Sequence, residues 1–340
     1  QVEQTPLWAA SDPRVRVLSH ERAASTHPNA NTRLVMETGG RDTLDTPRSE
    51  AVGLVGVGLL GQAIASRLLA AGYSVTGWDT SGGALEALVE MGGIAGANCG
   101  EALACRRVIL SLPDDTVVAE VLGESGEALS GGTTVIDTTT GDPLRQARIG
   151  RRLAEQGISY LDATVGGSSR HVREGTAVVM AGGATQAFAG CGDLLAAFSS
   201  RAFHVGGCGS GSRMKLVVNL VLGLNRAALA EGLALADGFE LDPALTLECL
   251  QAGPAWSRAM DDKGQKMIEG DFEPQARLSQ HLKDVRLIID AGADLDVVLP
   301  LSKLHQRLLE AVEAAGFGDE DNSAVVRAWG LHGDGPLTDG

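Results

Sequence analysis

The apolar positions that follow residue 50 occur in a strand, turn, helix, strand order. Residues 51–55 form a short apolar run, which predicts a buried strand. Over residues 59–72 the apolar side chains recur on one helical face, and a glycine ends the pattern. Residues 73–79 then alternate into a second predicted strand. The pattern predicts the first β-α-β unit of a layered α/β domain.

Strand-like runs continue to about residue 206 and then stop. Helical stretches separate most of them, so we expect a mainly parallel sheet with helices on both faces. From residue 213 to about 327 the apolar spacing is helical throughout, and a glycine-rich stretch at 206–212 marks the change. The further predicted strands are 107–113, 133–140, 158–165, 176–183 and 202–206.

Four segments follow from these patterns. Residues 1–49 show little periodicity and are predicted to be a flexible extension. Residues 50–209 form the predicted sheet domain, and residues 210–328 form a predicted all-helical domain. Residues 329–340 are predicted to be a flexible tail.

Charge and composition narrow the possible partners. The formal net charge of -15 disfavours nucleic acid and anionic membrane surfaces, because both need clustered lysine and arginine. The apolar segment 216–236 contains polar and charged residues, so we interpret it as a buried helix rather than a membrane span. The first 49 residues lack a secretory apolar core, and the five scattered cysteines fit reduced thiols. We therefore expect a cytoplasmic protein.

The turn after the first predicted strand contains a glycine spacing that is typical of nucleotide-binding turns. A G-x-G-x-x-G match is weak evidence in a chain with 45 glycines, but this one lies between a predicted strand and a predicted helix. In such a turn Gly56 permits the tight bend, Gly58 allows the pyrophosphate to approach the backbone, and Gly61 allows close helix packing. The helix N-terminus then offers free N–H groups to phosphate. We predict a Rossmann-type doubly wound sheet that binds a dinucleotide, followed by an all-α domain.

Asp79 bears on which dinucleotide binds. It ends the second predicted strand, roughly 20 residues beyond the glycines, where a carboxylate accepts hydrogen bonds from ribose hydroxyls. A 2'-phosphate about 4 Å away would be repelled by about 4 kcal/mol per charge pair at an effective dielectric of 20. We therefore predict NAD, with NADP less favoured. Two alternatives remain open: Asp79 is a solvated turn residue, or Thr80, Ser81 and arginines from elsewhere accommodate a phosphate.

Lys215 and Asn219 form a candidate catalytic pair at the start of the helical domain. They are four residues apart, so both side chains project from one face of a helix. A lysine beside a carbonyl oxygen can donate a proton as hydride reaches the carbon, or accept it in the reverse direction. Taken alone, such a pair is also compatible with an ordinary solvated lysine.

Several motifs follow one another in a fixed order along the chain. They are "GLVGVGLLG", "SLPDDTVVAEVL", "VIDTTTGDP", "DATVGGSSRHVREGTAVVMAGG", "GSGSRMKLVVN", "HLKDVRLI" and "LPLSKLHQRLLEAVEAAGFGDEDNSAV". Together they resemble the β-hydroxyacid dehydrogenases, the family of 3-hydroxyisobutyrate dehydrogenase and relatives of 6-phosphogluconate dehydrogenase. The resemblance covers about residues 51–327.

The resemblance implies a role for several residues. Lys215 would be the catalytic acid/base and Asn219 its substrate-positioning partner. Lys283 matches the family lysine near the nicotinamide end of the cofactor. Together, the glycine motif and the resemblance imply a cofactor site made of Gly56, Gly58, Leu59, Leu60, Gly61, Asp79, Thr80, Leu112, Pro113, Thr140 and Lys283.

The expected substrate loop departs from the family pattern. The family has Ser-Gly-Gly where this chain has Gly166, Gly167 and Ser168, so the usual hydroxyl is absent. The backbone amides remain able to bind an anion. Arg170 and His171 replace small residues; they either read an additional substrate group or point into solvent. The expected substrate-binding residues are Gly166, Gly167, Ser168, Ser169, His171, Lys215 and Asn219, and no cluster has metal-ligand spacing.

These features predict an NAD(P)-dependent oxidoreductase. Its substrate would be a small 3-hydroxy acid, converted reversibly to a semialdehyde or keto acid. The family resemblance also implies a homodimer or homotetramer joined through the 216–236 helix. One alternative is a non-catalytic NAD(H)-binding redox sensor, and another is an imine reductase-like enzyme. Lys215 argues against the second, because imine reductases typically lack a lysine at that position.

Overall fold

The computed structural model describes residues 15–18, 33–37, 50–124 and 126–333. The chain divides into two units, one that ends at Lys215 and one that begins at Leu216. The predicted boundary at residues 209 and 210 therefore lies six residues too early. The reason is local: the first turn of the helix that begins at Ser210 is hydrogen-bonded to the sheet and belongs with it. The two units are described separately, as the sheet unit and the helical unit.

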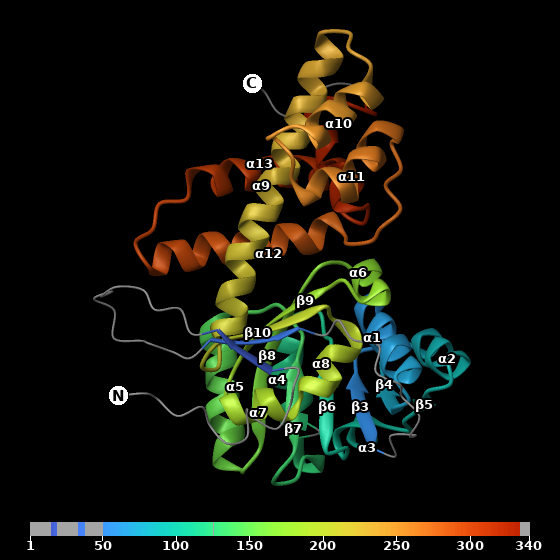
Figure 1. The fold of residues 1–340 in the computed structure, drawn as a ribbon, viewed down its shortest axis with the longest axis vertical. Coiled ribbons are helices and arrows are strands. Elements are labelled where there is room, and N and C mark those ends of the chain that lie inside the picture. Colours follow the sequence, from blue (N-terminus) through green and yellow to red (C-terminus); the bar gives the residue numbers. More distant parts are fainter. Residues whose placement is uncertain (1–14, 19–32, 38–49, 125, 334–340) are drawn as a thin grey trace. The chain divides into compact units, whose positions relative to one another are not determined.

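The sheet unit contains one ten-stranded sheet in the order β1-β2-β10-β9-β8-β7-β6-β3-β4-β5 (Figure 1). Strands β3 to β8 pair in parallel, whereas β9 runs antiparallel to β8. Because β4 and β6 lie on opposite sides of β3, the carboxyl ends of β3 and β6 form a topological switch point, where α/β sheets bind ligands. The strands are β1 Val15–Leu18, β2 Arg33–Glu37, β3 Ala51–Val55, β4 Ser74–Trp78, β5 Ile94–Ala95, β6 Arg107–Leu110, β7 Thr134–Asp137, β8 Ser159–Gly166, β9 Val178–Gly182 and β10 Arg201–Gly206.

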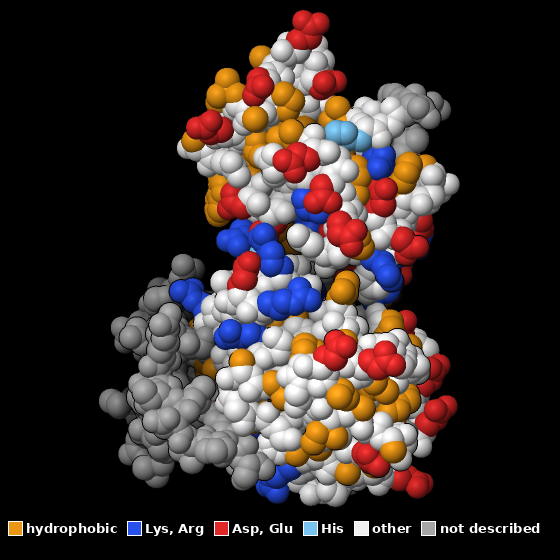
Figure 2. Space-filling view, turned by 90° about the vertical axis from the view of Figure 1, so that its right-hand side faces the viewer, with side chains coloured by type: hydrophobic (Ala, Val, Ile, Leu, Met, Phe, Trp, Pro, Cys, Tyr) orange, Lys and Arg blue, Asp and Glu red, His pale blue; other side chains and the backbone are white. Residues whose placement is uncertain are grey.

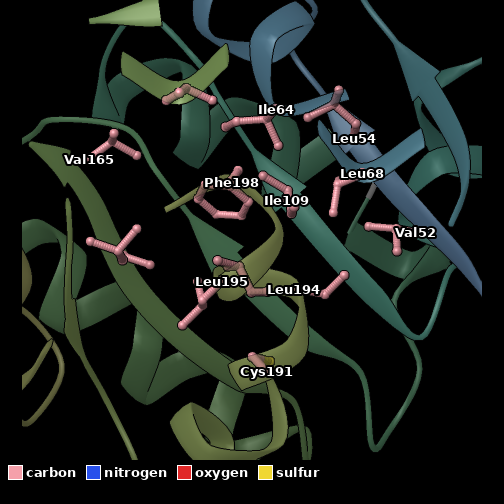
Figure 3. Packing of buried hydrophobic residues seen from close by; sticks show 14 of the residues in the cluster. Val52, Leu54, Ile64, Leu68, Ile109, Val165, Cys191, Leu194, Leu195 and Phe198 are labelled. Carbon is pink, nitrogen blue, oxygen red and sulfur yellow. The ribbon is translucent and has the colours of Figure 1, made fainter. Parts of the chain in front are cut away.

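Helices cover both faces of this sheet, as the alternating pattern predicts. Two separate clusters of buried side chains result, one on each face. In the first, Ile64 and Leu68 of α1 and Phe198 of α8 pack on strand residues such as Ile109 (Figure 3). The helices are α1 Leu59–Ala70, α2 Gly82–Glu90, α3 Cys99–Leu103, α4 Asp115–Glu124, α5 Pro143–Glu155, α6 Ser169–Glu174, α7 Thr185–Gly190 and α8 Gly192–Phe198.

The prediction of a flexible segment at 1–49 is wrong for its described part. Residues 15–18 and 33–37 form β1 and β2, and β2 pairs antiparallel with β10. Met36 is 4% exposed and joins the first core cluster. A Cβ added to Gly192 would lie 2.7 Å from the Met36 sulfur, so this glycine leaves room for the methionine. Both strands are only four or five residues long and are flanked by polar residues, so they have too little periodicity to be recognised in advance.

The helical unit continues α9, which runs from Ser210 to Gly238. Its buried positions, such as Leu229 and Leu233, pack in a core shared with the following helices. A buried ion pair joins Lys263 to Asp321, with the ammonium nitrogen 2.8 Å from a carboxylate oxygen. The remaining elements are α10 Pro243–Ala252, α11 Arg258–Glu269, α12 Leu278–Asp294, α13 Pro300–Val312, a π turn at Glu313–Phe317 and a 3-10 helix at Asn322–Trp329.

One face of α9 is not covered, contrary to the expectation of a buried helix over 216–236. Val217, Val221 and Leu235 are 51–61% exposed. Helix α9 is long and apolar enough to cross a membrane, but 44% of its apolar window is buried, as in the core helix of a globular protein. The physical reason is that a single helix buries one stripe on its own core and leaves the opposite stripe outside. Figure 2 shows hydrophobic side chains on the surface of the helical unit.

Candidate cofactor and substrate site

The glycine turn lies between β3 and α1, at the switch point of the sheet. Gly56 has a φ of +91°, and a Cβ there would lie 2.2 Å from the Ser111 carbonyl oxygen. A Cβ at Gly61 would lie 2.1 Å from the Gly56 carbonyl oxygen. A Cβ at Gly58 would meet nothing within 4 Å. The first and third glycines therefore allow close packing, whereas the second leaves open space in front of the N-terminus of α1, where a pyrophosphate fits.

Asp79 follows β4 and is tied to this turn. Its carboxylate accepts hydrogen bonds from the Val57 amide at 2.6 Å and from the Ser81 amide at 2.8 Å. These bonds fix the carboxylate beside the glycine turn and leave lone pairs for further donors. Leu59 and Thr80 are exposed beside it, and Leu60 is half-buried against the core. The remaining lone pairs of the carboxylate can accept hydrogen bonds from the adenosine ribose hydroxyls of a dinucleotide.

The loops after β6 and β7 are bonded to each other. The Leu112 amide donates to the Thr139 hydroxyl at 3.1 Å, and the Thr138 hydroxyl donates to the Leu110 carbonyl at 2.8 Å. Pro113 is exposed, and Thr140 is half-buried. The family resemblance points to Leu112, Pro113 and Thr140 but not to Thr139, because a hydroxyl 27 residues from its partner amide cannot be recognised from the local sequence.

The expected substrate loop follows β8. Gly167 has a φ of +132°, and the Ser168 amide donates to Nδ1 of His171 at 3.1 Å. The Ser168 hydroxyl also lies 3.0 Å from that nitrogen. The Ser168 amide is therefore bonded within the chain in this structure, and anion binding by the backbone amides of this loop stays a prediction. Ser169 begins α6 and is 7% exposed, and Arg170 pairs with Glu174 at 3.7 Å.

Lys215 belongs to the sheet unit and is bonded to the strand that precedes this loop. Its ammonium nitrogen donates to the Val165 carbonyl at 2.6 Å. Asp162, on the same strand, accepts from the amides of Gly209 and Ser212 at 2.8 and 2.9 Å. Burial raises the pKa of Asp162, while these amide donors oppose the shift. Thus β8 fixes the first turn of α9, and the lysine with it; the sequence analysis missed Asp162.

Asn219 and Lys283 lie in the helical unit, joined by an acid that the sequence analysis also missed. The Asn219 amide nitrogen donates to Asp284 at 2.9 Å, and Asn219 is 6% exposed. The Lys283 ammonium nitrogen lies 3.7 Å from the other Asp284 oxygen. Asp284 therefore orients the amide that is one helical turn beyond Lys215 on α9. The "KD" pair in the sequence was the available signal, but only its lysine was selected.

No group of three or more histidine, cysteine, aspartate or glutamate side chains in the described part of the chain is arranged to hold a metal ion. The residues brought together in the sheet unit are the glycine turn, Asp79, the two bonded loops, the segment 166–169 and Lys215. Asn219 and Lys283 come together in the helical unit.

Comparison with known proteins identifies the family. Residues 51–206 match the model of the NAD-binding domain of 6-phosphogluconate dehydrogenase, and residues 209–329 match that of the NAD-binding domain of NADP-dependent 3-hydroxyisobutyrate dehydrogenase. The chain is 32% identical over 287 residues to 2-(hydroxymethyl)glutarate dehydrogenase of Eubacterium barkeri, covering 83% of this chain and 95% of that protein. The chain belongs to the β-hydroxyacid dehydrogenase family.

Two further relatives agree with this placement. L-threonate dehydrogenase of Cupriavidus necator is 30% identical over 286 residues, which is 82% of this chain and 96% of that protein. The crystal structure of 3-hydroxyisobutyrate dehydrogenase from Salmonella typhimurium superposes with a TM-score of 0.77 at 27% identity, over 82% of this chain and 99% of the other. As in the family, the sheet unit is a Rossmann-type domain for a nicotinamide dinucleotide.

Proposed function

We propose that the protein is an NAD-dependent dehydrogenase that interconverts a small 3-hydroxy acid and its semialdehyde or keto acid. The bound nicotinamide would take or return the hydride. Lys215 would move the proton: its neutral amine accepts the hydroxyl proton during oxidation, and its ammonium returns a proton to the carbonyl oxygen during reduction. Asn219, oriented by Asp284, would hold the same oxygen.

The position of the Lys215 ammonium carries this proposal. The ammonium nitrogen bonds to Val165, the residue directly before the 166–169 loop. Asp162 fixes the turn of α9 that precedes the lysine. A lysine anchored in this way differs from a solvated surface lysine. The named activities of the relatives, which act on hydroxymethylglutarate and threonate, support a hydroxy acid as the substrate class.

The test compares wild type with Lys215→Met on a panel of 3-hydroxy acids, sugar acids and semialdehydes with NAD and NADP. We expect kcat on the best substrate to fall by about 10²- to 10⁴-fold, the usual contribution of general acid/base catalysis. Lys303→Met, which removes an exposed lysine from α13, serves as the matched control and should leave kcat unchanged. Full turnover by Lys215→Met would show that the catalytic assignment is wrong. Tight cofactor binding with no turnover of any panel member would favour a redox sensor instead.

A second copy of the chain would cover the exposed stripe of α9. Val217, Val221 and Leu235 are spaced to form one apolar face along this helix. We propose that the protein is at least a homodimer joined there. Sedimentation equilibrium of wild type and Val221→Glu tests this, and an unchanged mass for the variant would exclude this face as the interface.

A further inference from the structure

Four buried residues lie at or next to the start of the cofactor loop that follows β7. Asp137 ends β7, Thr139 follows it, Gln146 comes from α5, and Tyr160 comes from β8. Each of the four is 5% exposed or less. No step of the proposed reaction uses them, although two of the four can ionise.

Hydrogen bonds join these four residues into a closed ring. The Thr139 amide donates to one Asp137 oxygen at 2.9 Å, and the Tyr160 hydroxyl lies 2.5 Å from the other. The same hydroxyl lies 3.1 Å from the Gln146 side-chain oxygen. The Gln146 side-chain nitrogen completes the ring by donating to the Thr139 carbonyl at 3.1 Å.

The number of available protons determines in which ionisation state of Asp137 every polar atom of the ring has a hydrogen-bond partner. With Asp137 ionised, the tyrosine hydroxyl has one proton for two acceptors, the carboxylate and the glutamine oxygen. The better-placed carboxylate takes it, and the buried glutamine oxygen loses a full hydrogen bond. With Asp137 protonated, the acid donates to the tyrosine, and the tyrosine donates to the glutamine. Every polar atom of the ring then has a partner, which buried networks require.

The surroundings of Asp137 agree with a held proton. Burial raises its pKa to about 6, against the opposing effect of its hydrogen bonds, and the nearby Asp162 charge adds to the rise. The titratable groups that face it in the described structure are Tyr160 and Asp162 on β8 and Cys208 after β10, and none is a cation. Burial also raises the pKa of Tyr160 well above its ordinary value, so the phenol keeps its proton.

The ring is connected to both cofactor loops. Thr139 is a ring member through its amide and its carbonyl, and its hydroxyl accepts the Leu112 amide of the other loop at 3.1 Å. Thr140 is the next residue. Any shift of the Thr139 peptide therefore moves Leu112 and Thr140, two residues of the expected cofactor site.

We propose that Asp137 is a positioning residue that holds one proton within the Asp137–Tyr160–Gln146–Thr139 ring, and that this proton sets the two cofactor loops in their binding geometry. The inference rests on the proposed function only in so far as these loops bind the dinucleotide. Loss of the proton would loosen the loops and weaken cofactor binding. No substrate chemistry is involved.

The experiment measures NAD affinity by titration calorimetry at pH 5.5 and pH 8.0, without substrate. For wild type we expect Kd to rise by about 3- to 10-fold at the higher pH, the effect of one lost hydrogen bond. Asp137→Asn copies the protonated acid, because its amide group donates to Tyr160 and its oxygen accepts from Thr139. This variant should bind NAD equally well at both pH values, with the wild-type Kd of pH 5.5. Tyr160→Phe, which breaks the ring, should bind weakly at both.

Infrared spectroscopy provides a second measurement that does not depend on cofactor binding. At pH 5.5 wild type should show the C=O stretch of a protonated buried carboxyl, shifted by ¹³C-aspartate labelling and absent from Asp137→Asn. The inference fails if this band is missing, or if wild type and Asp137→Asn share one pH dependence of Kd. A chain that binds no dinucleotide at either pH would instead overturn the proposed function.

Discussion

In the two units burial shifts the pKa of ionisable groups of opposite kinds, although the helical unit also buries the acids Asp284 and Asp321. The sheet unit buries the acids Asp137 and Asp162, and burial raises the pKa of both. The helical unit buries the bases Arg226, Lys263 and His305, and burial lowers the pKa of all three. In the first unit the acids accept backbone amides at the carboxyl edge of the sheet, where the loops must be held in place. In the second, Lys263 and Asp321 lie inside the packing of the helices.

Buried charged groups therefore have different roles in the two units. Asp162 and Asp137 fix backbone next to the candidate site, so their loss should affect binding or turnover. Asp321 accepts from Lys263 and from the amides of Gln275 and Ser323, and these bonds hold separate helices of one core together. Their loss should affect the stability of the helical unit.

The largest expected effect follows Lys263→Met. Removal of the lysine leaves the Asp321 carboxylate buried without its cation, which costs about 3–5 kcal/mol. Urea unfolding gives the total loss, and hydrogen exchange of α11 peptides should locate it in the helical unit. The double variant Lys263→Met/Asp321→Asn should recover most of this lost stability, because it no longer buries an unpaired carboxylate. A loss below 1 kcal/mol would mean that this buried pair is not needed for packing.

The next effect belongs to the sheet unit and has a defined pH dependence. Because the pKa of Asp137 is raised to about 6, its contribution to stability is full below pH 4 and is lost as pH rises through 6. Asp137→Asn removes this loss, so at pH 8 we expect the variant to gain up to about 3 kcal/mol over wild type. Urea unfolding at pH 4.5 and pH 8 checks this; an equal difference at both pH values would contradict it.

His305 should give the opposite pH dependence in the helical unit. Burial, aided by the Arg226 charge, lowers its pKa to about 3, so the folded unit excludes a proton that the unfolded chain binds. The contribution of neutral His305 to the stability of the helical unit is therefore present above pH 6.5 and is lost as pH falls. From pH 6.5 to 4.5 we expect a loss of about 2.5 kcal/mol, measured by hydrogen exchange of α13 peptides.

The matched variant is His305→Phe, which keeps an aromatic ring beside His281, whose centroid is 5.2 Å away. This variant should remove most of the stability loss that acid causes in α13, as measured by hydrogen exchange of its peptides. Hydrogen exchange of the α1 peptides should not change. A wild-type slope retained in the variant would assign the acid sensitivity to another group.

The smallest effect concerns an acid of the sheet unit that is only half-buried. Asp79→Ala should raise the preference for NADP over NAD by roughly 5- to 30-fold, the range given by 1–2 kcal/mol. The ratio of kcat/KM for the two cofactors measures it. Glu86→Ala, on the exposed face of α2, controls for the change in net charge. An unchanged ratio would mean that Asp79 does not determine cofactor choice.

Local patterns predicted the architecture well, and contacts between distant residues were missed. The strand, glycine turn and helix from Ala51 to Ala70 are readable because glycine spacing and apolar periodicity lie within 20 residues. The Asp162 bonds to the start of α9 join residues 47 and 50 apart, and Asn219 meets Asp284 across 65 residues. Nothing in the neighbourhood of Asp162 distinguishes it from an ordinary strand residue, and the only local signal for Asp284 is its place in the "KD" pair.

Met36 sets a practical limit on how far the chain can be shortened. The first of the two matched family models begins at residue 51, and a protein trimmed to that point would retain every residue of the candidate site. It would nevertheless lose the side chain that fills the hollow left by Gly192, and β10 would lose its β2 partner. We therefore expect the shortened protein to keep the candidate site and to unfold at a lower urea concentration than the full chain.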